Sequence, residues 1–364
     1  MPTGSPHATG SPHATGSPHA GVPRPLARRA FLGALARRVA GAGGGLLAIP
    51  TLAGCDPREY ARKHGAKQHL SVASGPAGGV YYLYAGGIAK VISAHVRSVD
   101  ATAEVTSASV DNLKFVRDGR ADLALTLAPT LDDAYRGAGA FARTARVPAN
   151  AIASLFVQYT HVVTFDGSRI ARVADLRGKT VAVGGQGSGT EDMALRILRA
   201  AGLDPARDIR RQGLGVAAAA EALKDGKIDA FFWSSGIPAG PILDVANTPG
   251  RRMRLIPNDD ALPALQGMHG SGLYRRAVIP ARTYPGVPGD VPTTGTTTLL
   301  VVDERMSDAL AYEITRALFD YRADLEAIHP AARELRPETA STGSPVPFHP
   351  GAVRFYTERG VWTA

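Results

Sequence analysis

Two glycine-rich segments carry the residues of this chain that are best suited to bind a ligand. GPAGGVYY occupies residues 75–82 and GGQGSGT occupies residues 184–190, and each lies between a predicted strand and a predicted helix. Glycine lets a ligand approach the backbone, and the start of a helix offers unpaired N–H groups with partial positive charge. A tight strand-to-helix turn would explain either segment alone. Two such turns in matching places indicate that both helix starts clamp one anionic group.

The enzyme motifs that resemble glycine-rich turns are incomplete in this chain. A phosphate-binding loop needs Gly-Lys-Ser/Thr after its spacers, and no such run is present. The dinucleotide pattern needs glycine where Thr190 stands, and a hydrolase elbow needs glycine where Gln186 stands. No set of His, Cys and carboxylate residues has a metal-binding spacing, so we expect no catalytic residue, no metal and no cofactor. Four histidines are expected to be packed or at the surface: His161, His269, His329 and His349.

Alternating β-rich and amphipathic runs must position these turns. Strands are predicted at 69–74, 101–106 and 121–127. One helix is predicted to open in GPAGGVYY and to run through about Ala94, and a second is predicted at 109–117. Four apolar residues mark the first helix: Leu83, Ile88, Val91 and Ile92. This βαβαβ order predicts a parallel sheet covered by helices.

The same pattern occurs a second time after a long β-rich run at 154–165. Strands are predicted at 179–183 and 228–232, helices at 191–201 and 216–224, and a further β-run and helical tail at 296–302 and 307–329. The order indicates an α/β fold in which a second lobe, 161–293, is inserted between two parts of a first lobe, 69–160 and 294–364. Strand ends and helix starts would then converge on a cleft between the lobes.

Charge and composition limit the possible partners. The 364 residues carry a net charge of +9, but five of the 41 Lys and Arg precede Cys55 and no Asp or Glu does. The remainder has 36 basic and 32 acidic residues, which is an ordinary surface and predicts no nucleic-acid partner. No apolar stretch after Cys55 is long enough for a membrane-spanning helix.

The first 54 residues resemble an N-terminal export signal that follows a low-complexity tract. TGSPHA is repeated three times over residues 3–20, and an over-extended reading frame is one explanation of that low-complexity tract. Arg28 and Arg29, followed by Ala-Phe-Leu, resemble a twin-arginine export signal, and Leu52-Ala53-Gly54-Cys55 resembles a lipoprotein box in which Cys55 carries the lipid. Residues 55–68 would be a polar tether, and the mature protein would lie at the outer face of the cytoplasmic membrane.

Six segments together resemble the TAXI-type solute receptors of tripartite ATP-independent periplasmic (TRAP) transporters. They are SGPAGGVYYLYAGGIAKVI (74–92), SASVDNLKFVRDGRADLAL (107–125), DLRGKTVAVGGQGSGTE (175–191), ALKDGKIDAFFWSSGIP (222–238), YPGVPGDVPT (284–293) and PFHPGAVRFYTERG (347–360). The resemblance implies a type II periplasmic-binding fold and no enzymatic activity. It further implies delivery of a glutamate-like amino acid or a dicarboxylate to a TRAP-type permease.

The resemblance also implies which positions bind the ligand. They are Gly78, Gly79, Val80, Tyr81, Ser107, Ser109, Asn112, Gly187, Ser188, Gly189, Thr190, Ser235, Gly236 and Pro238. Three departures make the first-lobe wall more apolar: Leu127 and Pro129 replace the usual Gln and Asp, and Ala108 replaces a common glycine. A ligand-sensing lipoprotein of the same fold and an exported hydrolase remain as alternatives to a transport receptor.

Overall fold

The computed structural model describes residues 67–362, where one ten-stranded sheet organises the chain. The residues predicted to direct export and lipidation lie outside the described residues: Arg28, Arg29 and Cys55. The strands follow the order β2-β1-β3-β10-β4-β7-β5-β6, while β8 pairs with β4 and β9 pairs with β10. Within the described part of the chain, no helix combines the length and the apolar character needed to cross a membrane.

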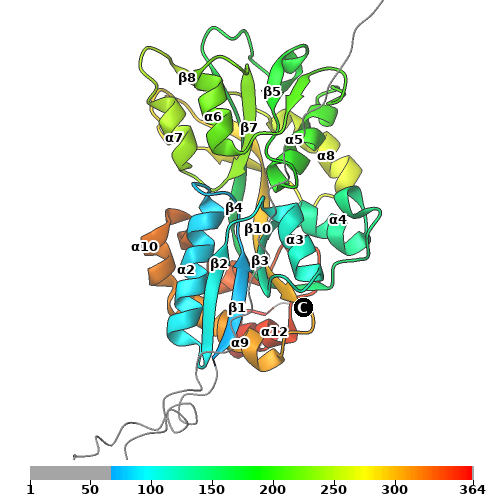
Figure 1. The fold of residues 1–364 in the computed structure, drawn as a ribbon, viewed down its shortest axis with the longest axis vertical. Coiled ribbons are helices and arrows are strands. Elements are labelled where there is room, and N and C mark those ends of the chain that lie inside the picture. The colour runs from blue at the N-terminus through cyan, green and yellow to red at the C-terminus, as the bar shows by residue number, and fades with distance from the viewer. Residues whose placement is uncertain (1–66, 363–364) are drawn as a thin grey trace, which may run out of the picture. The chain divides into compact units, whose positions relative to one another are not determined.

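Residues 67–148 and 304–362 form what we call the first half. It contains the parallel strands β1 (Gln68–Ala73), β2 (Val99–Glu104) and β3 (Leu123–Leu127). Its helices are α2 (Val80–His95), α3 (Ser109–Arg117), α4 (Ala128–Arg136), α9 (Asp308–Asp320), α10 (Arg322–Ile328), α11 (Pro337–Ala340) and α12 (Pro350–Glu358), and 3-10 turns lie at Gly139–Phe141 and Pro330–Glu334. The lower part of Figure 1 shows this half.

Residues 166–290 form the second half, in the upper part of Figure 1. Its strands β5 (Thr180–Ala182), β6 (Arg210–Gln212) and β7 (Ala230–Ser235) are parallel, and β8 (Met253–Leu255) and β9 (Arg275–Ile279) are antiparallel to their neighbours. Its helices are α5 (Gly189–Ala200), α6 (Val216–Lys224), α7 (Gly240–Ala246) and α8 (Leu262–His269), with 3-10 turns at Val173–Leu176 and Asp259–Ala261.

Two long strands join the halves: β4 (Ala149–Phe165) and β10 (Val291–Asp303). They pair with each other in antiparallel register, and β10 is also antiparallel to β3 as β4 is to β7. The prediction of a parallel sheet is therefore correct for β1, β2 and β3 and for β5, β6 and β7, and wrong for the sheet as a whole. The α/β class and the two-part organisation expected from the sequence are confirmed.

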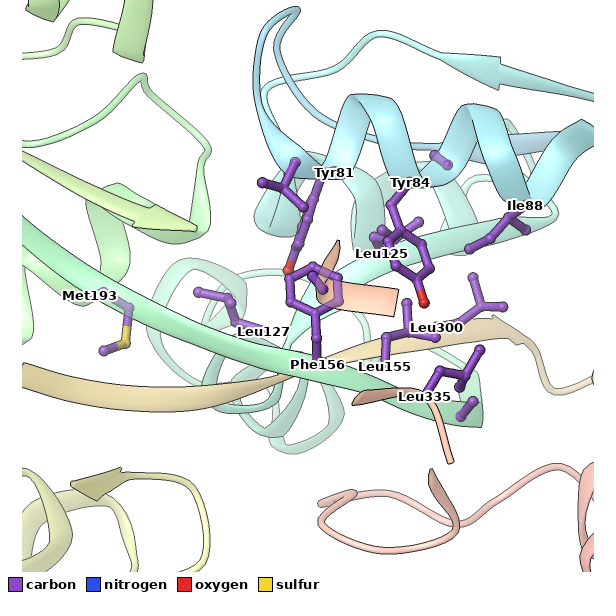
Figure 2. Packing of buried hydrophobic residues seen from close by; sticks show 14 of the residues in the cluster. Tyr81, Tyr84, Ile88, Leu125, Leu127, Leu155, Phe156, Met193, Leu300 and Leu335 are labelled. Atoms are coloured by element: carbon purple, nitrogen blue, oxygen red, sulfur yellow. The ribbon is translucent and has the colours of Figure 1, made fainter. Parts of the chain in front are cut away.

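Aromatic and aliphatic side chains of α2 pack onto the joining strands. Tyr81, Tyr84 and Ile88 are spaced to share one helix face and are buried, and the rings of Tyr84 and Phe156 lie 5.3 Å apart between centroids. Figure 2 shows this layer against Leu155 and Leu300. Leu83 is 42% exposed, because it belongs to the opposite face, whereas the other three apolar residues expected on this helix are buried.

Candidate ligand-binding site

A small pocket lies where the two halves meet, and we call it the cleft pocket. Its volume is about 20 Å³, which is room for a water molecule. Its wall is made of segments that follow, or end, the strands β1, β2, β3, β5 and β7, together with one residue of β4. The lining residues are Pro76, Gly79, Val80, Tyr81, Ala108, Ser109, Leu127, Gln158, Ser188, Gly189, Thr190, Trp233, Ser234 and Ser235.

Three helices begin at the cleft pocket and direct the positive ends of their dipoles toward it. The starts of α2 and α3 have no side-chain cap, so their first-turn N–H groups lack that partner. At α5 the Ser188 hydroxyl accepts a hydrogen bond from the Glu191 N–H at 3.0 Å, and its own proton remains able to donate. The three starts together favour a negative charge in the pocket.

Four side chains of the wall place polar atoms in buried positions where no hydrogen-bond partner lies among the described residues. They are the Tyr81 hydroxyl, Gln158 Oε1, Trp233 Nε1 and the Ser235 hydroxyl. The exposed fractions of these residues range from 2% to 7%. A buried polar atom left unpaired costs about 1–3 kcal/mol. Such a cluster in one place indicates a site that a polar ligand would complete.

Tyr81 remains a neutral hydrogen-bond donor at any physiological pH. Burial raises the pKa of its hydroxyl to about 12, and the nearby side chains of Thr298, Ser109 and Gln158 oppose this shift in part. None of them meets the hydroxyl in full hydrogen-bonding geometry. The phenol can therefore donate to a ligand and cannot repel an anion.

The second glycine turn brings the halves into direct contact. The Asp111 N–H donates to the Gly187 carbonyl at 3.2 Å, and the Gly187 N–H donates to Glu191 Oε2 at 3.0 Å. Gly187 has φ +78°, and a Cβ there would lie 2.7 Å from the Asp111 carboxylate. At Gly189 a Cβ would lie 2.6 Å from the Ser109 hydroxyl. Both glycines thus permit contact between the halves, and only Gly189 also lines the pocket.

The structure brings together eight of the fourteen residues predicted to bind the ligand: Gly79, Val80, Tyr81, Ser109, Ser188, Gly189, Thr190 and Ser235. The other six do not line the cleft pocket: Gly78, Ser107, Asn112, Gly187, Gly236 and Pro238. Gly78 instead borders a separate groove beside α6 and α7.

Asn112 has a structural role in the described chain. Its side-chain NH₂ donates to the carbonyls of Ser74 and Leu125, each at 2.7 Å, and its carbonyl accepts from the Thr106 hydroxyl at 2.5 Å. The side chain thereby ties the end of β1 to the middle of β3. Its amide groups are occupied by the protein itself, so it supports the site from outside the wall.

Sequence reasoning missed Gln158, Trp233 and Ser234. A signal existed for two of them, because Gln158 interrupts an apolar run that became β4, and Trp233 ends the apolar run of β7. Of the three departures from the family pattern, two lie in the pocket wall and one does not. Leu127 and Ala108 line the pocket, while Pro129 lies in the first turn of α4.

The four histidines lie away from the pocket wall, and three of them are held by hydrogen bonds within the protein. His161 is fully buried, with Nε2 3.0 Å from the Tyr284 hydroxyl, and burial lowers its pKa to about 4. His329 and His349 each cap a helix start by accepting from the N–H two residues ahead. His269 is half-buried beside Tyr274. None of the four lines the cleft pocket.

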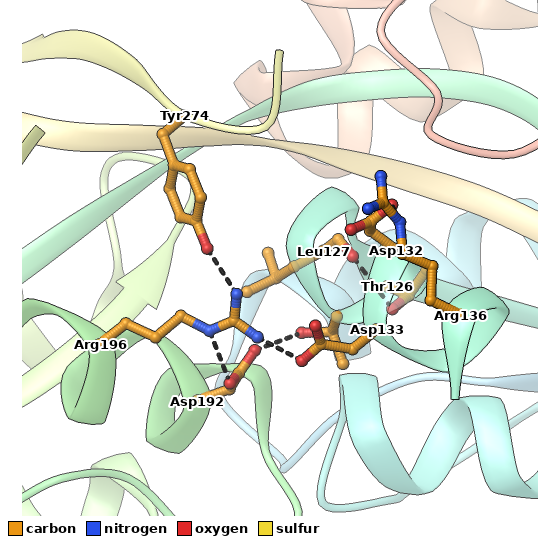
Figure 3. Close-up of polar contacts among 9 residues, drawn as sticks. Thr126, Leu127, Asp132, Asp133, Arg136, Asp192, Arg196 and Tyr274 are labelled. Carbon is orange, nitrogen blue, oxygen red and sulfur yellow. Dashed lines mark hydrogen bonds and ion pairs between the residues drawn. The ribbon is translucent and has the colours of Figure 1, made fainter. Parts of the chain in front are cut away.

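A buried polar network beside the pocket also joins the halves (Figure 3). The Arg196 guanidinium on α5 pairs with Asp133 of α4, donates to Asp192 at 2.9 Å, and meets the Tyr274 hydroxyl at 2.7 Å. The Thr130 hydroxyl of α4 donates to the other oxygen of Asp192 at 3.1 Å. The network holds α4 and α5 together across the cleft.

Several solved structures resemble this chain at low identity. The periplasmic aliphatic sulphonate-binding protein SsuA from Escherichia coli is 16% identical, with 74% of this chain and 75% of that chain covered and a TM-score of 0.41. A binding protein of a phosphonate ABC transporter from Pseudomonas aeruginosa is 11% identical, with 73% and 79% covered and a TM-score of 0.48. An ancestral arginine-binding protein is 15% identical, with 73% and 98% covered and a TM-score of 0.46.

A family model covers nearly all of the described residues. It is the model of the NMT1-like family, and it matches residues 72–360, from β1 to the end of α12. The matched span includes both halves and every residue of the cleft pocket. This chain therefore belongs to the NMT1-like family.

Proposed function

We propose that this protein is an extracytoplasmic solute-binding protein that captures a small carboxylate-bearing solute and delivers it to a membrane permease. The observation that carries the proposal is the cluster of unpartnered buried polar atoms on Tyr81, Gln158, Trp233 and Ser235. Three of these groups can donate a hydrogen bond. A carboxylate offers several acceptor positions on two oxygens, so one ligand group can satisfy several donors at once.

The carboxylate would be held without a cationic side chain. Hydrogen bonds to ionised groups are worth about 1.5–3 kcal/mol each, and helix starts add up to about 2 kcal/mol in partly buried sites. Ser188 and Thr190 bring hydroxyls to the start of α5, and Ser109 brings one to the start of α3. These groups supply the binding that an arginine provides in other carboxylate sites.

Binding of an organic acid requires the halves to separate. The cleft pocket holds about 20 Å³, which is too small for a solute of several carbon atoms. The contacts that close it include the Asp111 N–H bond to the Gly187 carbonyl and the approach of Gly189 to Ser109. The buried ion pair between Arg196 and Asp133 also joins the halves beside the pocket and must part when they separate. Motion of the halves about β4 and β10 would open the pocket and close it over the solute.

Transport is the role that we assign to this binding. The sequence resemblance to TAXI-type receptors favours a TRAP-type permease, and the Arg28-Arg29 and Leu-Ala-Gly-Cys55 motifs favour export and lipid anchoring at the outer face of the cytoplasmic membrane. We infer a binding role rather than catalysis, because none of the fourteen wall residues that the structure describes is a histidine that could act as a base for the hydroxyls.

A thermal-shift screen of the purified protein against amino acids and organic acids tests the binding role. A ligand at a hundred times its dissociation constant adds about 2.7 kcal/mol to stability. Ser235→Ala should weaken binding of the best acid about tenfold or more, since it removes a donor to a charged group. The matched control Ser168→Ala changes a serine that does not line the cleft pocket and should leave the affinity unchanged. Absence of any stabilising acid would contradict the proposal.

The permease type is tested by uptake of the identified solute in cells. A TRAP-type partner predicts uptake that collapses when the ion gradient is dissipated and persists when ATP is depleted under a maintained gradient. Uptake that follows ATP instead would place the protein with an ABC-type permease.

A further inference from the structure

We propose that the ligand is a small monocarboxylate that carries an uncharged hydroxyl group, rather than an amino acid or a dicarboxylate. This inference rests on the proposed binding function and narrows its substrate class. It follows from the balance of charges, donors and acceptors on the wall of the cleft pocket.

Fixed charge is missing from the wall. All fourteen lining residues lie in the described part of the chain, and none of them is Asp, Glu, Lys, Arg or His. Two carboxylates close to the second glycine turn have partners of their own: Asp111 lies 3.5 Å from the Lys114 ammonium, and Glu191 accepts from the Gly187 N–H and pairs with Arg211. In the closed form, the pocket is thus surrounded by hydrogen-bonding groups and helix starts, and none of the fourteen wall residues is ionised.

An ammonium group fits this wall poorly. A buried cation needs a carboxylate or several carbonyl partners to offset its lost hydration. Here the three helix starts present positive partial charge to the same space, which disfavours a cation further. The amino group of a glutamate-like ligand would therefore meet no carboxylate of the wall and three positive helix starts.

A second carboxylate is also disfavoured. The unpartnered donors on Tyr81, Trp233 and Ser235, with the helix starts, suffice for one anionic group. Two carboxylates in one enclosed space repel each other, and no cationic side chain of the wall would reduce that repulsion.

Gln158 is the reason for expecting a hydroxyl group on the ligand. Its Oε1 atom is buried and unpartnered, and an amide oxygen can only accept a hydrogen bond. A ligand that is only a carboxylate and an alkyl chain would leave this oxygen unpaired. A hydroxyl group can donate to it while adding no charge. Val80, Ala108 and Leu127 provide an apolar wall for the carbon atoms that carry the hydroxyl.

The test uses matched acids of two to five carbon atoms and isothermal titration calorimetry on the purified full chain. The classes are 2-hydroxy monocarboxylates, 2-amino monocarboxylates, unsubstituted monocarboxylates and α,ω-dicarboxylates. At the best chain length, the hydroxy acid should bind at least about tenfold more tightly than the other three, because a site built for a hydroxyl discriminates strongly against ligands that lack it.

The outcomes separate this inference from the function on which it rests. Tightest binding by an amino acid or a dicarboxylate would overturn the inference and leave the carboxylate-binding function in place. Binding of none of the acids would overturn both. Equal binding of the hydroxy acid and the unsubstituted acid would also overturn the inference, because Gln158 would then have no hydroxyl to accept from.

Gln158→Met adds an independent comparison. In this variant the preference for the hydroxy acid over the unsubstituted acid should fall to about one, since the acceptor is gone. Gln212→Met, at an exposed position of β6, should keep the full preference. A preserved preference in a folded Gln158→Met protein would overturn the assignment of Gln158. The comparison of ligands on the unchanged protein decides the substrate class even if that variant does not fold.

Discussion

Removing the guanidinium of Arg196 should be one of the most destabilising single changes in this protein. Arg196 is only 6% exposed at its side chain and joins two carboxylates, those of Asp133 and Asp192, which are 12% and 21% exposed. Arg196→Met keeps much of the aliphatic volume and leaves both carboxylates without their cation. It also removes the donor that meets the Tyr274 hydroxyl.

The expected loss of unfolding free energy follows from the two carboxylates that stay buried without a cation. Breaking a buried ion pair by removing one partner costs about 3–5 kcal/mol, mainly because an uncompensated charge stays inside. Urea unfolding at pH 7.5, followed by tryptophan fluorescence, should show a loss of this size for Arg196→Met. Adding Asp133→Asn and Asp192→Asn to the variant should restore much of it, because the unpaired charges are then gone.

The control is an exposed ion pair of the same chemistry. Arg207 is 87% exposed and lies 3.6 Å from Asp204 in the second half. Because exposed pairs contribute about 0–1 kcal/mol, Arg207→Met should change stability by no more than that. If Arg196→Met lost no more than Arg207→Met, the network would not hold α4 to α5 in solution, and the role we give it would be refuted.

Three further predictions concern the network, the start of α5 and the lipid. Burial is the largest cause that raises the pKa of Asp133 to about 6, against the opposing effect of Arg196. Between about pH 4 and 6 the folded protein therefore keeps a proton that the unfolded chain releases, so the stability from this group is lost as the pH rises through 6. The unfolding free energy of Asp133→Asn relative to the unchanged protein should rise over that range, and a flat difference in urea titrations would refute the assignment. Ser188→Ala should cost about 0.5–2 kcal/mol of stability through loss of the cap on the Glu191 N–H, besides weakening ligand binding, and thermal unfolding with calorimetry separates the two effects. Cells fed a fatty-acid probe should label the unchanged protein and not Cys55→Ser; equal labelling would end the lipid-anchor proposal.

Much of the fold was predictable because local patterns decide it. The helix at Ser109–Arg117 and the helix at Val216–Lys224 have the bounds expected from their apolar spacing and flanking glycines. The apolar residues named for the first helix did not show that Tyr81 and Tyr84 would occupy its buried face and leave Leu83 exposed. The antiparallel strands β4 and β10 were seen as β-runs, but their direction depends on pairing between residues more than a hundred positions apart.

The candidate site was predictable in part for a similar reason. Glycine turns and helix starts are local features, so Gly79 and Gly189 were found from the sequence. Asn112 is polar, buried and close to the site, and only the structure shows that carbonyls of β1 and β3 occupy its amide. Gln158 and Trp233 reach the pocket from strands of the central sheet, and a strand's pattern does not tell which of its residues ends at a cleft.

The indole N–H of Trp233 gives the most direct test of the account. The chain has two tryptophans, and Trp362 lies far along the sequence in the aromatic cluster with Phe348 and Tyr356. In a ¹H–¹⁵N spectrum of the purified protein, assigned with Trp233→Phe, the tightest-binding acid of the panel should shift the Trp233 indole signal downfield, because the N–H gains a carboxylate acceptor. The Trp362 signal should not move. An unmoved Trp233 signal at saturating acid would contradict the claim that the cleft pocket binds the solute.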